Sequence, residues 1–189
     1  GRQFFVPLTL DQASACLEWG LNWCVTANMH NFLIMHAAVI EQNGLCAILP
    51  APPGSGKSTL CAGLVMNGWR LLSDELALYD LDSGLMYGMA RPINLKNASI
   101  EVIRNFAPKA ILTRAVSNTS KGTVALLRPP TESVLRAREP ARPAWVILPK
   151  YEAGAQANMT PHTKAETFML LAEQTFNYHI HGIRAFEGL

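Results

Sequence analysis

Residues 45–68 read LCAILPAPPGSGKSTLCAGLVMNG, and this run predicts a strand, a glycine-rich loop and a helix in succession. Its first five residues form an apolar segment with the length of a buried strand. Residues 51–58, Ala-Pro-Pro-Gly-Ser-Gly-Lys-Ser, form a Walker A sequence with Ala in the first position, where Gly is commoner. A helix is expected over residues 57–66, ended by Asn67-Gly68. A strand before such a loop and a helix after it are the context that a phosphate-binding loop needs.

The residue types in this loop explain the chemistry that we expect from it. Gly54 and Gly56 let the backbone turn its N–H groups around phosphate oxygens, where a Cβ would obstruct them. Lys57 places a positive charge on the β- and γ-phosphates, and the Ser58 hydroxyl can ligate Mg²⁺. We therefore expect ATP and Mg²⁺ as cofactors, with the nucleotide bound by Pro53, Gly54, Ser55, Gly56, Lys57, Ser58 and Thr59. The alternative is a glycine loop with no ligand.

The remaining motifs restrict which nucleotide is bound and what becomes of it. The apolar run at residues 145–148 is followed by Pro149-Lys150, so it does not carry the acid of a Walker B strand. The acidic pair nearest to the loop helix along the chain is Asp74-Glu75. Residues 94–97, Asn-Leu-Lys-Asn, lack the Asp of the guanine-reading motif, which favours an adenine nucleotide.

The rest of the chain predicts an α/β fold in one domain over residues 1–189, with a mixed or mostly parallel sheet and flanking helices. The expected elements are a largely buried helix over 11–28, a strand over 33–41, a strand from Leu71 to about Tyr79 through Asp74, a helix over 97–106, a buried strand over 145–148 and a helix from the capping box Thr163-x-x-Glu166 to about Asn177. Most of residues 113–143 is expected to form a flexible loop, apart from a strand at 124–127.

Composition excludes several classes of protein and leaves others open. Hydrophobic residues make up 49% of the chain, which excludes a disordered protein, and charged residues make up only 16%. The shortage of charge is typical of a surface covered by a second copy or by a further segment, although a slightly apolar monomer fits as well. Residues 91–150 carry eleven Lys/Arg and three Asp/Glu, but no nucleic-acid-binding signature accompanies them, so nucleic acid is not an expected partner. A start at Gly1 without Met is typical of a fragment or of a tag remnant.

Cysteine usage and hydropathy indicate a cytoplasmic protein with no membrane span. Cys16, Cys24, Cys46 and Cys61 include no CxxC pair and no zinc-ligand spacing, and their apolar neighbours predict buried, reduced thiols. No apolar run approaches the roughly 18–20 residues of a transmembrane helix.

Three segments together resemble a known family. Residues 36–40, His-Ala-Ala-Val-Ile, precede the glycine loop, and residues 67–75, Asn-Gly-Trp-Arg-Leu-Leu-Ser-Asp-Glu, follow its helix. This order is similar to the catalytic domain of bacterial HPr kinase/phosphorylase, a P-loop fold related to phosphoenolpyruvate carboxykinase. Residues 91–97, Arg-Pro-Ile-Asn-Leu-Lys-Asn, and 176–178, Phe-Asn-Tyr, resemble a divergent branch, the HPr-kinase-related kinases.

The resemblance implies a kinase that transfers the γ-phosphate of ATP to a serine-like hydroxyl of a protein, peptide or small molecule. It implies Asp74 as the group that acts on the acceptor hydroxyl, and Glu75 in place of the family's second Asp at Mg²⁺. It also implies catalytic roles for Lys57, for His36 as the family's His beside the phosphates, and for Arg91 as the Arg of the family's signature segment. Ser58, Asp74 and Glu75 are therefore the expected metal ligands. Met89 and Ala90 stand where the family carries a further acidic metal-binding residue, and this departure leaves a non-catalytic nucleotide-binding regulator as the alternative.

Overall fold

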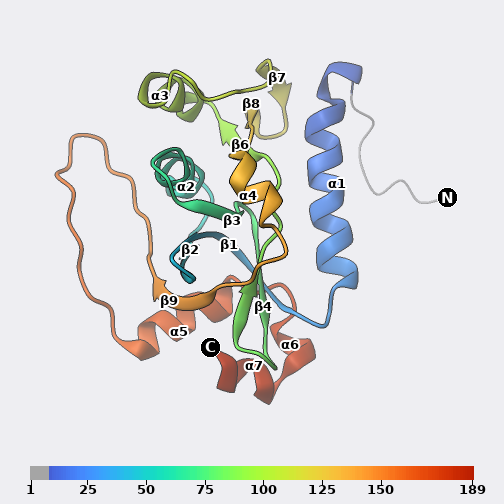
Figure 1. Cartoon of the computed structure of the whole chain (residues 1–189), viewed down its shortest axis with the longest axis vertical. Helices are drawn as coiled ribbons and strands as arrows, with labels where there is room; N and C mark the ends of the chain where they lie inside the picture. Colours follow the sequence, from blue (N-terminus) through green and yellow to red (C-terminus); the bar gives the residue numbers. More distant parts are fainter. Residues whose placement is uncertain (1–8) are drawn as a thin grey trace.

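The structure is a computed structural model that describes residues 9–189, and Figure 1 shows its arrangement. The expectation about the first residues of the chain lies outside the described residues. In chain order the elements are η1 Leu10–Gln12, α1 Ala13–Asn28, β1 Leu33–Gln42, β2 Leu45–Pro50, α2 Lys57–Met66, β3 Arg70–Ser73, β4 Leu76–Asp80, β5 Leu85–Tyr87, β6 Ile93–Lys96, α3 Ala98–Phe106, β7 Val116–Thr119, β8 Gly122–Leu127, α4 Thr131–Leu135, β9 Arg142–Val146, α5 Lys164–Glu173, α6 Tyr178–His181 and α7 Ile183–Gly188.

β1 is the central strand of a six-stranded sheet with the order β5-β4-β1-β2-β9, in which β3 also pairs with β1. The β2–β9 pair is parallel, and the other pairs in this sheet are antiparallel. The α/β class and the mixed sheet are therefore confirmed, whereas a mostly parallel sheet is wrong. One reason is local: Asn43 and Gly44 both have positive φ, and this geometry closes β1 and β2 into an antiparallel hairpin.

Both faces of the large sheet are covered. Ala38 and Ile40 of β1 belong to a core that includes residues of α2, α3 and the small sheet β6-β8-β7. Met35, Ala37 and Val39 point to the opposite face and belong to a second core, which includes Leu171 of α5. Alternate residues of a strand point to opposite faces, so burial on both faces explains the nearly continuous apolar sequence of β1.

The helix predicted at 11–28 exists as η1 and α1, but the prediction that it is largely buried is wrong. Ala15 is the one fully buried apolar residue of α1, while Leu17, Leu21 and Trp23 are exposed. Figure 1 shows α1 standing along one side of the molecule, so only one of its faces meets the body. The same placement leaves Cys24 exposed and Cys16 half-buried, whereas Cys46 and Cys61 are buried as predicted, and all four thiols are free.

The strand predicted from Leu71 to Tyr79 is split into β3 and β4 at Asp74-Glu75. Both halves lie antiparallel to β1, with Val39 opposite Ser73 and His36 opposite Leu76. The Ser73 hydroxyl accepts a hydrogen bond from the Leu76 N–H at 3.2 Å and closes the bend between the two strands. Sequence pattern alone does not reveal this bend, which turns the acidic pair out of the ladder.

Three further expectations need correction. Residues 113–143 are not mostly irregular, because they include β7, β8, α4 and the start of β9; their mobility stays a prediction. The strand expected at 145–148 is β9, and it ends at Val146. Trp145 is half exposed because β9 lies at the sheet edge. The predicted capping box of α5 is confirmed, but the helix ends at Glu173 rather than near Asn177, because residues 174–176 bond to β1 instead.

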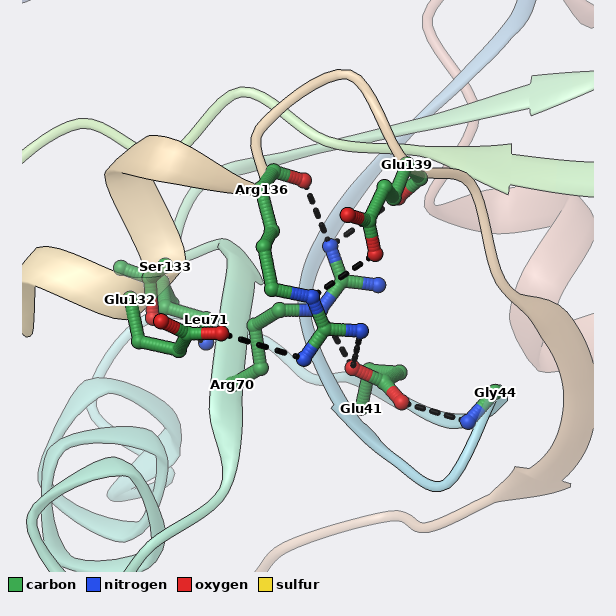
Figure 2. A network of polar contacts seen from close by, with 8 residues as sticks. All are labelled: Glu41, Gly44, Arg70, Leu71, Glu132, Ser133, Arg136 and Glu139. Carbon is green, nitrogen blue, oxygen red and sulfur yellow. Dashed lines mark hydrogen bonds and ion pairs between the residues drawn. The ribbon is translucent and has the colours of Figure 1, made fainter.

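Helix α4 is attached to the sheet by a polar network, which Figure 2 shows. The Arg70 guanidinium at the start of β3 pairs with Glu41 of β1 and donates to the carbonyl oxygens of Arg136 at 2.9 Å and Glu139 at 3.0 Å. The Gly44 N–H donates to the second Glu41 oxygen, and the Ser133 hydroxyl accepts from the Leu71 N–H at 2.9 Å. This network lies at the end of β1 opposite to His36.

Within residues 9–189, no helix has the length and apolar character needed to cross a membrane.

Candidate functional site

The loop between β2 and α2 has the backbone geometry that its glycines permit. Gly54 and Gly56 have φ of 87° and 90°, in the left-handed region that side chains disfavour. Pro52, Pro53 and Gly54 are exposed, and Ser55 and Gly56 are half-buried, so the outer part of the loop meets solvent. Gly56 is the N-cap of α2, and its carbonyl oxygen accepts from the Leu60 N–H at 2.9 Å. The N-terminus of a ten-residue helix therefore opens at this loop, a place that attracts anions.

Lys57 is the first residue of α2, and its side chain is buried to 7% exposure. Its Nζ lies 2.9 Å from Nε2 of His36 on β1. Burial lowers the pKa of Lys57, while the carboxylates of Asp74 and Glu75 act in the opposite direction. A buried ammonium needs partners, and His36 is one that a phosphate oxygen can replace.

Asp74 is the buried member of the acidic pair, with 4% exposure. Its Oδ2 accepts a hydrogen bond from the Asn94 N–H at 3.0 Å, while its Oδ1 has no hydrogen-bond partner within residues 9–189. Burial and the nearby Glu75 charge raise the pKa of Asp74 to about 6, although the Asn94 N–H, Lys57 and the Ser58 hydroxyl oppose the shift. A buried acceptor without a partner is costly, so Oδ1 is a candidate ligand for a cation or a hydroxyl group.

Glu75 lies between positive groups. Its carboxylate oxygens lie 3.7 Å from His36 Nε2 and 3.7 Å from Lys96 Nζ. Burial would raise the pKa of Glu75, but His36, Lys96, Lys121 and Lys57 outweigh it and lower the pKa to about 2. His36 Nε2 cannot accept from Lys57 and donate to Glu75 at once. The contact to Lys57 has hydrogen-bond length, and when His36 accepts from Lys57 the ammonium groups of Lys96, Lys121 and Lys57 still lower the pKa of Glu75.

Arg91 lies near the acidic pair, but its guanidinium is directed to α1. It bonds to the Asn22 side chain and lies 3.2 Å from the Glu18 carboxylate. A small cavity of about 10 Å³ separates these groups from the acid pair; its lining is Glu18, Asn22, Ser73, Asp74, Glu75, Met89, Arg91, Pro92 and Asn94. The structure therefore brings together Lys57, His36, Asp74 and Glu75. The Arg91 guanidinium does not join them, because it contacts α1 on the other side of this cavity.

A larger cleft of about 340 Å³ opens beside His36 and Glu75. Its other lining residues are mostly aromatic or apolar and come from α1, β4, the β7–β8 turn and the segment after α5: Trp19, Asn22, Trp23, Thr26, Leu76, Lys121 and Phe176. The Lys121 ammonium lies 5.1 Å from the centre of the Trp19 ring. Sequence reasoning did not assign the two tryptophans to a site, although their spacing of four residues puts them on one face of a helix.

A cluster of three or more His, Cys, Asp or Glu side chains suited to a metal does not occur among residues 9–189. Ser58, Asp74 and Glu75 offer oxygen atoms only, which are the ligands that Mg²⁺ prefers. Mg²⁺ is commonly held by one or two carboxylates together with phosphate oxygens of the substrate, and the partnerless Asp74 Oδ1 fits such an arrangement.

The chain matches no protein-family model, and a search of curated proteins finds no matching relative.

The buried Asp74 charge makes a prediction for stability. Its pKa of about 6 in the folded chain lies above the ordinary 3.8, so the folded state binds the proton more tightly than the unfolded state. Ionisation of Asp74 therefore lowers the free energy of unfolding, with no penalty below about pH 4 and the full penalty above about pH 6. Asp74→Asn keeps an oxygen for the Asn94 N–H and should stabilise the fold by about 1–3 kcal/mol above pH 6.

Urea unfolding of both chains at several pH values measures this difference. The gain should shrink towards zero near pH 4. Asp82→Asn, at an exposed carboxylate, is the matched control and should show no such pH dependence. A gain that is constant with pH would show that the Asp74 charge is not the cause.

Proposed function

We propose that the chain is an ATP-dependent kinase, which transfers the γ-phosphate to a serine-like hydroxyl of a protein, peptide or small-molecule acceptor. The observation that supports this most is that four groups lie together at the C-terminal end of β2. They are the glycine loop with positive φ at Gly54 and Gly56, the buried Lys57, His36 at 2.9 Å from the Lys57 Nζ, and the acidic pair. The likeness to HPr-kinase-related kinases in sequence order agrees with this proposal.

In the proposed site, the loop amides of residues 54–58 and the α2 N-terminus bind the phosphates, and Lys57 exchanges its contact with His36 for one with a phosphate oxygen. Ser58 and one acid of the 74–75 pair, for which Glu75 is the better candidate, would hold Mg²⁺, and the ion would neutralise charge on the β- and γ-phosphates. The ionised Glu75, with its pKa of about 2, keeps a negative charge at the site over the physiological pH range.

The protein takes little part in the covalent chemistry of phosphoryl transfer, and acts mainly by positioning the reactants and stabilising charge. The acceptor oxygen forms a bond to the γ-phosphorus, the bond from that phosphorus to the β,γ-bridging oxygen breaks, and ADP leaves. The acceptor proton passes to a carboxylate, for which Asp74 is the better candidate, since a pKa of about 6 suits a base near neutral pH better than a pKa of about 2. The aromatic cleft beside Glu75 is the side from which we propose that the acceptor enters.

One observation favours a second candidate function, a nucleotide-binding regulator that transfers no phosphate. Asp74 is only 4% exposed, and the cavity of about 10 Å³ beside it, which Glu18 and Asn22 of α1 also line, is too small for an acceptor. An acceptor therefore reaches this acid only when the groups around the cavity move. A regulator needs no such movement.

Lys57→Met tests the nucleotide site directly. Methionine keeps most of the buried volume of lysine but removes the charge, so Mg–ATP affinity should fall about 10- to 100-fold. Isothermal titration calorimetry measures this, and Lys150→Met, at an exposed lysine, is the control that should bind like the wild type. A wild-type chain that binds no Mg–ATP at millimolar concentration would rule out both candidate functions.

Phosphate transfer then separates the two candidates. The wild-type chain is incubated with γ-labelled ATP and with hydroxyl acceptors of the peptide and small-molecule classes. Label in an acceptor supports the kinase. Binding of ATP with no label in any acceptor and no release of phosphate favours the regulator.

A further inference from the structure

The segment between β9 and α5 is long and irregular, and it begins against the glycine loop. Residues 147–163 contain no helix or strand. Near its start, the Tyr151 N–H donates a hydrogen bond to the Ser55 carbonyl oxygen at 2.9 Å. A Cβ built on Gly56 would lie 3.0 Å from the Tyr151 Cβ, so Tyr151 packs directly against Gly56. Irregular loops longer than about 12–15 residues are uncommon in compact domains and are frequently binding loops or lids.

Topology explains why this segment reaches the loop. β2 and β9 are the parallel pair of the large sheet, with Ile48 opposite Val146. Neighbouring parallel strands have their C-terminal ends on the same side of the sheet, and ligands of open α/β sheets bind just beyond these ends. The glycine loop follows β2 and residues 147–163 follow β9, so both connections leave the sheet on this same side. Figure 1 shows the segment after β9 as a wide loop on the side of the molecule that carries α2.

Tyr151 presents a large aromatic side chain beside this loop without being buried. Its exposure is 75%, and residues 150–163 are exposed throughout. The Tyr151 backbone is bound to the glycine loop, while most of the residue is exposed to water. Its ring therefore offers a flat apolar face next to a position that is suited to phosphate. Purine bases stack on such faces, and the interaction tolerates different bases because each base has a π-face.

We propose that Tyr151 is the base-binding residue of the nucleotide site, with its ring stacked on the adenine while the glycine loop and Lys57 hold the phosphates. This inference rests on the proposed nucleotide binding and adds the part of the ligand that the glycine loop does not contact.

A comparison of ATP with inorganic tripolyphosphate tests the inference, because only ATP carries a base. Calorimetry with Mg²⁺ gives the dissociation constant of each ligand. Tyr151→Ala should weaken ATP binding about tenfold and leave tripolyphosphate binding unchanged within twofold. Tyr151→Phe keeps the ring and should bind ATP like the wild type. Met159→Ala, at an 84% exposed position in the same segment, is the matched control and should change neither constant.

The outcomes separate the inference from the function on which it rests. If the wild type binds neither ligand, the nucleotide site fails and the inference fails with it. If the wild type binds both ligands and Tyr151→Ala binds ATP equally well, the nucleotide site stands and the stacking role is wrong. If Tyr151→Ala weakens both ligands alike, the Tyr151 ring only supports the glycine loop, since alanine keeps the N–H that bonds to Ser55 and the Cβ beside Gly56, and the base-binding role is again wrong.

Discussion

Asp74→Asn should reduce the rate of phosphate transfer about 100- to 10,000-fold, the range expected when a positioned proton acceptor is lost. Asparagine has nearly the same shape and keeps an oxygen for the Asn94 N–H, so the bend between β3 and β4 should persist. It cannot accept the acceptor proton, and it removes one negative charge near Lys57. Mg–ATP affinity should change far less than the rate, since the glycine loop and Lys57 are intact.

Single-turnover transfer from γ-labelled ATP, with the nucleotide at saturation, measures the chemical step alone. Asp82→Asn is the control for the loss of a carboxylate, because Asp82 is exposed and pairs with Arg184, and neither residue belongs to the proposed site. The variant is expected to be folded and more stable than the wild type above about pH 6, so a low rate cannot be attributed to unfolding. Transfer at the wild-type rate would remove Asp74 from the mechanism.

Glu75→Gln distinguishes the roles of the two acids. Glu75 has a pKa of about 2 and lies between His36 and Lys96. It is therefore a weak base, and its carboxylate stays negatively charged over the physiological pH range. Its replacement should raise the Mg²⁺ concentration needed for half-maximal rate more than it lowers the rate at saturating Mg²⁺. The reverse result, with a larger loss in rate than for Asp74→Asn, would assign the base to Glu75.

The sequence predicted the local elements around the glycine loop well, for reasons that are themselves local. The Gly54 and Gly56 spacing, the apolar run before it and the Asn67-Gly68 end of α2 depend on neighbours only a few residues apart. The same holds for the capping box of α5, in which Thr163 and Glu166 satisfy each other. Such signals survive in any tertiary context.

Features that depend on distant contacts were missed. At the bend, the Asp74 side chain accepts a hydrogen bond from the Asn94 N–H of β6, a strand that was not predicted. The exposure of α1 was missed because apolar residues on all sides of a helix indicate burial, whereas α1 meets the body along one face. His36 lies beside Lys57 only because β1 places it between the loop after β2 and the bend before β4.

Removing Glu41 should cause the largest loss of stability. Glu41 and Arg70 have 2% and 6% exposure, and their side chains pair directly in the network of Figure 2. Glu41→Ala leaves the guanidinium buried without its counter-charge and removes the acceptor of the Gly44 N–H at the β1–β2 turn. Breaking a buried pair from one side costs about 3–5 kcal/mol, whereas an exposed pair is worth about 0–1 kcal/mol. Urea unfolding should therefore show a much lower midpoint for Glu41→Ala than for Asp82→Ala, which breaks the exposed pair with Arg184.

The double variant Glu41→Met/Arg70→Met identifies the physical origin of that loss. If the cost comes from an unpaired buried charge, removing both charges and filling their space with apolar side chains should restore most of the stability lost in Glu41→Ala. The contacts of Arg70 with the carbonyl oxygens of Arg136 and Glu139 would still be missing, so α4 should loosen, and its amides should exchange faster than in the wild type. A double variant no more stable than Glu41→Ala would mean that these carbonyl contacts, and not the charge pair, hold α4 and the start of β3 together.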